Sequence, residues 1–362
     1  MHKPQYMLLG LLLLTLPIQD AFATENYKDY VERSIAGYIQ PAFDRFSEEA
    51  QALPEITRSL CEQPTPANRE AFSDKFSAVV EDFASVHFLR FGPLIDEHRL
   101  ESLAFMPDPR GIAQRQIRKA LAKEDGTLTD PESLRQKSVA LQGLTALELI
   151  AFNSKAELVL GEPADNGELL CAYGAAITEN IASIAQTIAD EWRDENGYRK
   201  VLTETGPDNP VLHNDKEAIE TIFNALTTGL IIVKDQDLLP AIGTELKKAK
   251  PHRMPFSRSG NSLRYISAEL QGIGDVIQAA DFTPGLGEDF SWLPNSIAFE
   301  IKQGQDYLAT INAPVRSSFK TPETYDKIRT LVITVDSLRD TVALEMAGAL
   351  GLTGGFNALD GD

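Results

Sequence analysis

The sequence predicts an all-α protein made of two packed antiparallel helical bundles. Apolar residues recur three and four positions apart, which places them on one face of a helix, while strand-like alternation is scarce. Stretches rich in proline and glycine separate long helical segments into two groups with short connections, as in antiparallel bundles. A single large, irregular all-α domain is the alternative, because periodicity does not determine topology.

The first group of helices is predicted over residues 24–200. Pro41 lies within its first helical segment and is expected to kink or end that helix. Asp108 and Asp130 each precede a proline, the pattern of a capping acid followed by Pro at the first helical position. The periodic sets of this group are Tyr27, Tyr30, Val31, Ile35, Tyr38, Ile39; Phe72, Phe76, Val79, Phe83; and Ile177, Ile181, Ile184, Ile188, Trp192.

The second group is predicted over residues 201–362 and shows the same spacing. One set runs from Ile219 into LIIV at 230–233, which by composition is the best strand candidate in the chain. A later set, from Tyr325 to Val342, contains the β-branched stretch VITV but keeps helical spacing. GYRKVLTETGPDNP at 197–210 is the strongest break and predicts the boundary between the groups, and DFTPGLGEDF at 281–290 divides the second group.

The first 23 residues resemble a cleaved secretory signal peptide. Lys3 precedes an apolar run from Met7 to Pro17, and Ala21-Phe22-Ala23 provides small residues at a cleavage site. The run is shorter than the roughly 20 apolar residues of a spanning helix, and no later stretch supplies them. The sequence therefore predicts a mature chain without a transmembrane segment, in the periplasm or cell envelope.

The formal net charge of −19 argues against nucleic acid as a partner, because a phosphate backbone is repelled by such a field. Excess acid also keeps a protein surface soluble without any ligand, and this is the simpler explanation of the charge.

The two cysteines, Cys61 and Cys171, can form a disulfide in an oxidising compartment if the fold brings them together. The bond would close a loop of about 110 residues and add on the order of 4 kcal/mol to stability in the chain-entropy model. Two separately buried thiols are the alternative. A metal site is less favoured, because neither cysteine has a second Cys or a His at ligand spacing.

Glu148 lies in LQGLTALELIAF, residues 141–152, which is apolar almost all round. Gly143 and Thr145 share its helix face, so the carboxylate is predicted to be partly buried and to need a cation, a metal or several donors. One explanation is a structural ion pair with an arginine of MPDPRGIAQRQIRK, where Arg110, Arg115 and Arg118 are available. The other is a metal ligand, although one carboxylate alone is too few.

Other chemistry-bearing residues show weaker patterns. No two histidines stand three or four apart; His87 belongs to an apolar helix face, His98 to a charged cluster, and His213 and His252 to loops. No G-x-S-x-G turn, phosphate-binding loop or dinucleotide-binding glycine pattern is present. Ser257, Ser259 and Ser262 are explained as helix caps, and Arg258 beside them can bind an anion at a helix start.

The segment Gly143-Leu144-Thr145-Ala146-Leu147-Glu148 resembles the G-x-H-x-x-E motif of the imelysin-like family, also classed as M75 peptidases, with Thr145 in place of the motif His. RFGPL at 90–94, FMPDPRG and RQI within 105–117, and FSRSGNSL leading into LQGI within 256–273 extend the resemblance along most of the chain. The resemblance implies an exported protein of two helical bundles, with the motif near the contact between them and a role around iron or another divalent metal.

Three functions follow from these patterns. The leading one is a non-catalytic, imelysin-like envelope protein that binds iron through Glu148, or assists an envelope or outer-membrane partner in iron uptake. The second is an M75-type metal-dependent peptidase, which the loss of the motif His disfavours because imidazole is the commonest metal ligand. The third is a structural or interaction module in which the motif has decayed into core packing.

Overall fold

The computed structural model describes residues 27–312, 314–319 and 321–353. Within these ranges the chain is helical apart from turns, loops and one isolated antiparallel bridge between Phe152 and Leu158, so the predicted all-α class is confirmed. The predicted signal peptide, residues 1–23, lies outside the described residues. LIIV at 230–233 is helical and shows that the spacing of apolar residues outweighs β-branched composition there.

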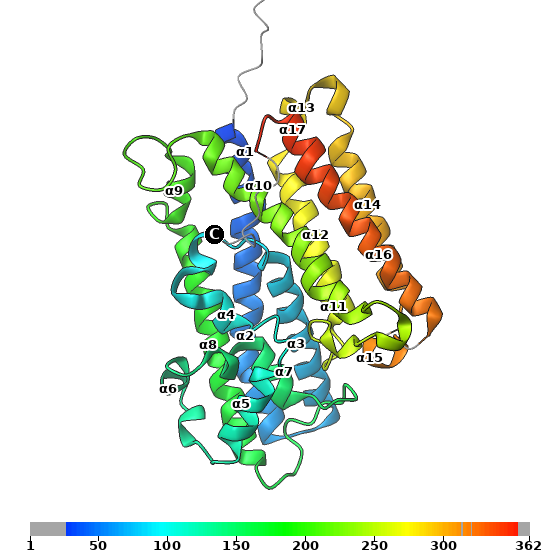
Figure 1. Cartoon of the computed structure of the whole chain (residues 1–362). Coiled ribbons are helices and arrows are strands. Elements are labelled where there is room, and N and C mark those ends of the chain that lie inside the picture. Colours follow the sequence, from blue (N-terminus) through cyan, green and yellow to red (C-terminus); the bar gives the residue numbers. More distant parts are fainter. Residues whose placement is uncertain (1–26, 313, 320, 354–362) are drawn as a thin grey trace, which may run out of the picture.

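The first half of the chain forms a bundle around three long helices, α2, α3 and α8, which lie side by side in Figure 1. Its α-helices are α1 (Tyr27–Ser34), α2 (Gln40–Glu62), α3 (Pro66–Val86), α4 (Arg99–Leu103), α5 (Ile112–Leu121), α6 (Pro131–Arg135), α7 (Gly143–Ala151), α8 (Gly167–Arg193) and α9 (Tyr198–Thr203). Between them lie a π-helical turn, η1 (Ile35–Ile39), and short 3₁₀ turns, η2 (Gly92–Leu94), η3 (Asp96–His98), η4 (Gly126–Leu128) and η5 (Val139–Leu141).

The second half packs α10, α12, α14 and α16 beside the first (Figure 1). Its α-helices are α10 (Asp215–Ile231), α11 (Leu239–Ile242), α12 (Ser262–Ala280), α13 (Thr283–Phe290), α14 (Leu293–Ala309), α15 (Val315–Ser318), α16 (Pro322–Asp340) and α17 (Ala347–Ala349). The remaining turns are the π-helical η6 (Ile232–Leu238) and η9 (Thr341–Met346) and the 3₁₀ turns η7 (Leu246–Lys248) and η8 (Pro251–Arg253).

Capping side chains set several helix starts. The side chain of Thr65 caps α3, and that of Asp130 caps α6 ahead of a proline, as its pattern predicts. Asp108 differs from its prediction: it accepts hydrogen bonds from the backbone N–H groups of Ile112 and Ala113, but Gly111 at φ 62° interrupts the helix after Pro109. Pro41 lies where α1, η1 and α2 run on as one continuous helix, and the π-helical turn η1 directly precedes it, so the helix is locally distorted there rather than ended.

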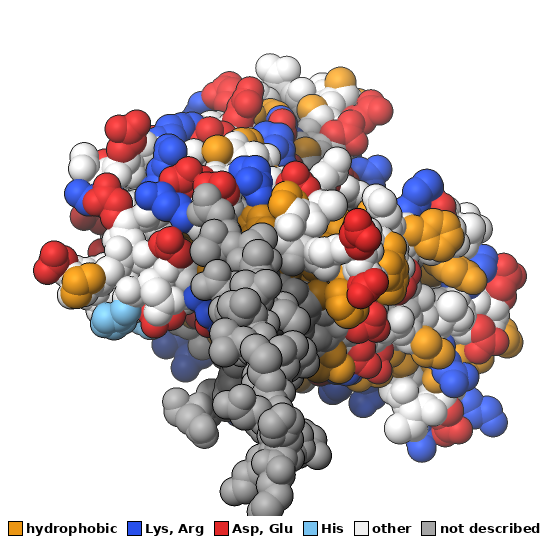
Figure 2. Space-filling model, turned by 90° about the horizontal axis from the view of Figure 1, so that it is seen from above, with side chains coloured by type: hydrophobic (Ala, Val, Ile, Leu, Met, Phe, Trp, Pro, Cys, Tyr) orange, Lys and Arg blue, Asp and Glu red, His pale blue; other side chains and the backbone are white. Residues whose placement is uncertain are grey.

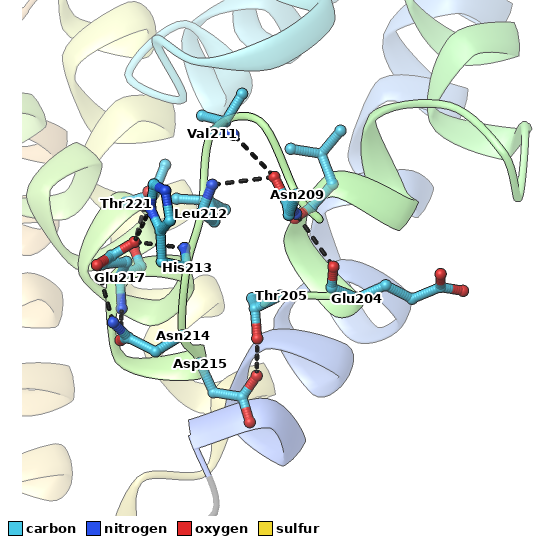
Figure 3. Close-up of polar contacts among 11 residues, drawn as sticks. Glu204, Thr205, Asn209, Val211, Leu212, His213, Asn214, Asp215, Glu217 and Thr221 are labelled. Carbon is cyan, nitrogen blue, oxygen red and sulfur yellow. Dashed lines mark hydrogen bonds and ion pairs between the residues drawn. The ribbon is translucent and has the colours of Figure 1, made fainter. Parts of the chain in front are cut away.

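The predicted boundary segment at 197–210 contains α9 and an ordered turn that leads to α10 (Figure 3). The side chain of Asn209 donates to the carbonyl oxygens of Val201 and Glu204 and accepts from the N–H groups of Val211 and Leu212. Asn209 thus replaces the backbone partners that the proline-rich turn lacks. Whether the boundary separates two domains stays a prediction.

The two halves share one continuous apolar core. α1 belongs to the first half by sequence but packs against α10 and α12, and α12 packs along α3. Gly272 permits this approach, because a Cβ there would lie 2.4 Å from the carbonyl oxygen of Ser85. Helix packing therefore fixes the position of the second half on the first.

Cys61 and Cys171 form a disulfide that joins the end of α2 to the start of α8. These helices pack against each other along the first bundle. The disulfide therefore fixes one end of the most extensive helix pair of that bundle.

Figure 2 shows the end of the molecule near α1, α13 and α17, where acidic and basic side chains are intermixed. The negative net charge is therefore not gathered into a single acidic block on this face. No helix in the described ranges is both long and apolar enough to cross a membrane.

Candidate functional site

A cleft of about 610 Å³ lies between the two halves. One side is formed by residues 105–109 together with Thr145 and Glu148 of α7. The other side is formed by η6, by residues 252–258 before α12, and by Arg316 of α15. Thr145 and Glu148 therefore line the same cavity, together with Asp108, His252, Ser257 and Arg258.

Gly143 begins α7 and determines how closely this helix approaches α4. Its φ is +70°, and a Cβ at this position would lie 2.3 Å from the carbonyl oxygens of both Ser102 and Leu103. No residue with a side chain fits there without moving the backbone. The glycine of the motif therefore places α7, and with it Glu148, at the wall of the cleft.

Glu148 is buried, with 8% of its surface exposed, and it connects the two halves. Its Oε1 atom accepts hydrogen bonds from the backbone N–H of Ser259 at 2.7 Å and from the Ser259 hydroxyl at 2.9 Å. Burial raises the pKa of Glu148, while the two Ser259 bonds and the positive charges of Arg316 and Arg258 act to lower it.

The partners of Glu148 differ from the predicted ion pair. Arg110, Arg115 and Arg118 are all exposed, and the donors to Glu148 come from the turn before α12 instead. Ser259 was predicted only as a helix cap. The physical reason is long-range packing: the turn at Ser259 is 111 residues away along the chain and is placed by α12.

Thr145, which the family resemblance pairs with the motif histidine, lies on the cleft wall. Its hydroxyl is buried, and Oγ1 has no hydrogen-bond partner within the described residues, so the hydrogen bond to Glu148 that its spacing allows is not formed. His252 also lines the cleft, whereas His87 is buried elsewhere and His98 and His213 are exposed.

Arginine side chains give the cleft wall near Glu148 a positive character. The Arg316 Nε donates to the Ser257 hydroxyl at 3.1 Å, and burial together with the charge of Arg258 lowers the pKa of Arg316. Arg258 donates through Nη1 to the Phe152 carbonyl at 3.3 Å, while its buried Nε has no partner in the described residues. Two guanidinium groups thus face one carboxylate, and their donors are only partly used.

The donor set does not fit a metal ion held by the protein alone. Within the described residues, no three His, Cys, Asp or Glu side chains converge as such a site requires. Glu148 supplies one carboxylate whose Oε1 is already bonded to Ser259, and a threonine hydroxyl is a poor ligand. The arrangement is instead suited to an oxygen-rich anion, which arginine binds through paired N–H donors.

Asp237 is the cleft residue that the sequence patterns did not reveal. It lies in the π-helical turn η6, it is 7% exposed, and its Oδ2 atom has no hydrogen-bond partner within the described part of the chain. Its surroundings in the sequence, VKDQD, are typical of a solvated stretch. Only the π turn and the packing of α12 direct Asp237 inward.

Replacing Glu148 with Ala is expected to lower the free energy of unfolding by about 1.5 kcal/mol, because the N–H and hydroxyl of Ser259 lose their charged acceptor. Glu148→Gln keeps an oxygen acceptor at the same position and is expected to remain near wild type. Urea unfolding of the three proteins measures the difference. Equal destabilisation of both variants would show that the charge, not the hydrogen bonds, carries the contribution.

Comparison with known proteins gives a consistent result. The model of the imelysin family, peptidase M75, matches residues 39–342. The crystal structure of an imelysin-like protein from Psychrobacter arcticum 273-4 superimposes with a TM-score of 0.76 at 18% identity, covering 91% of this chain and 97% of that one. A putative iron-regulated protein A precursor from Parabacteroides distasonis ATCC 8503 superimposes with a TM-score of 0.67 at 15% identity, covering 90% and 96%.

No curated protein matches the chain. The family match covers most of the sequence, and both structures share the helical architecture described above. The chain therefore belongs to the imelysin family.

Proposed function

We propose that this protein is a non-catalytic iron-binding protein of the cell envelope, an accessory of iron uptake, and that it takes up iron as an anionic chelate in the Glu148 cleft. The metal ion is the cargo in this proposal, and its first ligands belong to the chelator. An envelope or outer-membrane uptake protein is the expected partner.

The two arginines beside Glu148 are the observation that carries the proposal. Arg258 and Arg316 lie beside the cavity, and the buried Nε of Arg258 lacks a partner within the described residues. Guanidinium groups bind carboxylate oxygens through two parallel hydrogen bonds. A ferric chelate built from hydroxycarboxylates presents such oxygens on its surface, so the arginines can bind it without contacting the metal.

The wider setting also supports an iron-related role. One structural neighbour is described as an iron-regulated protein A precursor, and the first 23 residues of this chain have the pattern of a signal peptide. The expectation that the protein is not a peptidase rests on Thr145, because a threonine supplies neither the base nor the metal ligand that a histidine would.

Calorimetric titration of the mature chain, from residue 24 onward, with ferric citrate tests the proposal. Saturable binding is expected for wild type, and Arg258→Met and Arg316→Met are expected to weaken it at least about tenfold each, since each removes a charged donor while keeping an aliphatic stem. Ferrioxamine B, a cationic chelate, is expected not to bind. Citrate without iron separates recognition of the chelator from recognition of the complex.

Arg264→Met is the matched control. Arg264 lies on α12 outside the cleft, where its side chain is 65% exposed and pairs with Glu81. Its replacement is expected to leave the affinity for ferric citrate unchanged. Failure of ferric citrate to bind, or equal binding by wild type and both cleft variants, would contradict the proposed function and favour a purely structural role for the motif.

A further inference from the structure

A buried pair of carboxyl groups lies behind the η6 side of the cleft. Asp237 lines the cleft from η6, and Glu269 of α12 lies next to it with none of its surface exposed. Neither Glu269 oxygen forms a hydrogen bond of ordinary geometry within the described residues, and the same is true of Asp237 Oδ2. Two acids in such a place require an explanation, because an unpaired buried charge is costly.

Arg90 is the cation that acts on both acids. Its Nη2 lies 2.8 Å from His87 Nε2, which must therefore accept the bond, so the ring carries its proton on Nδ1. That Nδ1 is 3.3 Å from Glu269 Oε1. Burial, and then the charge of Arg90, lower the pKa of His87 well below its ordinary value, so the imidazole is neutral.

The other groups around the pair add no second cation. Tyr265, one turn before Glu269 on α12, is buried and uncharged, and burial raises its pKa well above the ordinary value. On η6 itself, Lys234 pairs with other acids: its Nζ lies 2.7 Å from Oδ1 of Asp336 on α16 and 3.7 Å from Oδ1 of Asp235. Within the described residues, one guanidinium charge therefore faces two carboxyl groups.

This charge count favours at least one proton on the pair. With one carboxyl protonated, the remaining negative charge balances Arg90, whereas two carboxylates would leave an uncompensated charge in a buried place. Burial raises the pKa of Asp237 to about 7 and, together with the charge of Asp237, raises that of Glu269 well above its ordinary range. Asp237 therefore keeps its proton below about pH 7 and loses it above, whereas Glu269 holds its proton more strongly.

We propose that Asp237 is a second recognition residue of the cleft, which donates its carboxyl proton in a hydrogen bond to an oxygen atom of the bound anion. The inference rests on the proposed function, because it concerns the same ligand. Asp237 is the member that lines the cleft, whereas Glu269 is fully buried behind it. Glu269 acts through Asp237 and is a positioning residue.

The proposal gives ligand binding a defined pH dependence. An anion that accepts the proton of Asp237 binds the protein better when Asp237 is protonated than when Asp237 is ionised. Affinity for ferric citrate is therefore expected to fall as pH rises through about 7, by up to about tenfold for each pH unit above it. Over the same range the free protein loses the proton, so binding at about pH 8 takes one up.

Calorimetric titration with ferric citrate at about pH 6.5 and pH 8, in two buffers of different ionisation enthalpy, measures both the affinity and the proton uptake. Asp237→Asn is nearly isosteric and keeps an N–H donor that does not titrate. This variant is expected to bind at both pH values without proton uptake, and its residual pH dependence reports the ionisation of the chelate itself.

Glu269→Gln keeps an uncharged hydrogen-bond donor beside Asp237. This variant is expected to retain the pH dependence and the proton uptake of wild type. If the two acids had a merely structural role, the two variants would not differ in the pH dependence of ferric citrate binding. If either variant does not fold, the proton uptake of wild type in the two buffers still decides the question.

The outcomes separate the two proposals. Binding by wild type without proton uptake, or an unchanged pH profile in Asp237→Asn, would overturn the role of Asp237 and leave the proposed function intact. Absence of binding at either pH would overturn both, because no anion would then be present to receive the proton.

Discussion

Simultaneous replacement of Cys61 and Cys171 with Ser is expected to lower the free energy of unfolding by on the order of 4 kcal/mol. The disulfide joins residues 110 positions apart, so it restricts a large part of the unfolded chain. In the folded protein it joins the end of α2 to the start of α8, whose packing forms the centre of the first bundle. Guanidinium unfolding of wild type and the double variant measures the loss.

Reduction provides an internal control for this prediction. A thiol reductant is expected to destabilise wild type by the same amount and to leave the double variant unaffected, since the variant has no cysteine in the chain. Loss of less than about 1 kcal/mol in both measurements would contradict the prediction and indicate that the unfolded chain is already restricted in this region.

The fold was largely predictable from local patterns. Apolar spacing identified α3 and α8, and capping chemistry identified the start of α6, because these signals depend on neighbours within a turn or two of the same helix. The π-helical turns were not predictable, because they depend on how a helix packs rather than on its own composition. One of them, η6, places Asp237 in the cleft.

The candidate site was predictable only in part. The apolar surroundings of Glu148 indicated a buried acid in need of donors, but its donor, Ser259, lies in the other half of the chain. Glu269 did have a local signal, since it shares a helix face with Tyr265 and Ile273 and both are fully buried. A carboxylate on an apolar helix face therefore marks a polar cluster, but its partners are determined by tertiary packing.

The buried acid pair is also expected to make the stability of wild type depend on pH. The pKa of Asp237 is about 7 in the folded protein against the ordinary 3.8. The folded state therefore binds more protons than the unfolded state between these values, and stability falls as pH rises through about 7. Relative to Asp237→Asn, wild type is expected to lose about 2 kcal/mol of unfolding free energy between about pH 5.5 and pH 8.5.

Comparison of these two proteins isolates the acid from other groups that titrate in this range. Burial raises the pKa of Asp82 to about 6 and lowers that of His87, but both effects are present in wild type and in Asp237→Asn alike. His87 acts in the opposite direction, because its neutral form is favoured by folding and its contribution is lost as pH falls. Urea unfolding at several pH values gives the difference directly. A constant difference between the two proteins over the whole range would mean that Asp237 is ionised throughout, with its charge balanced by Arg90.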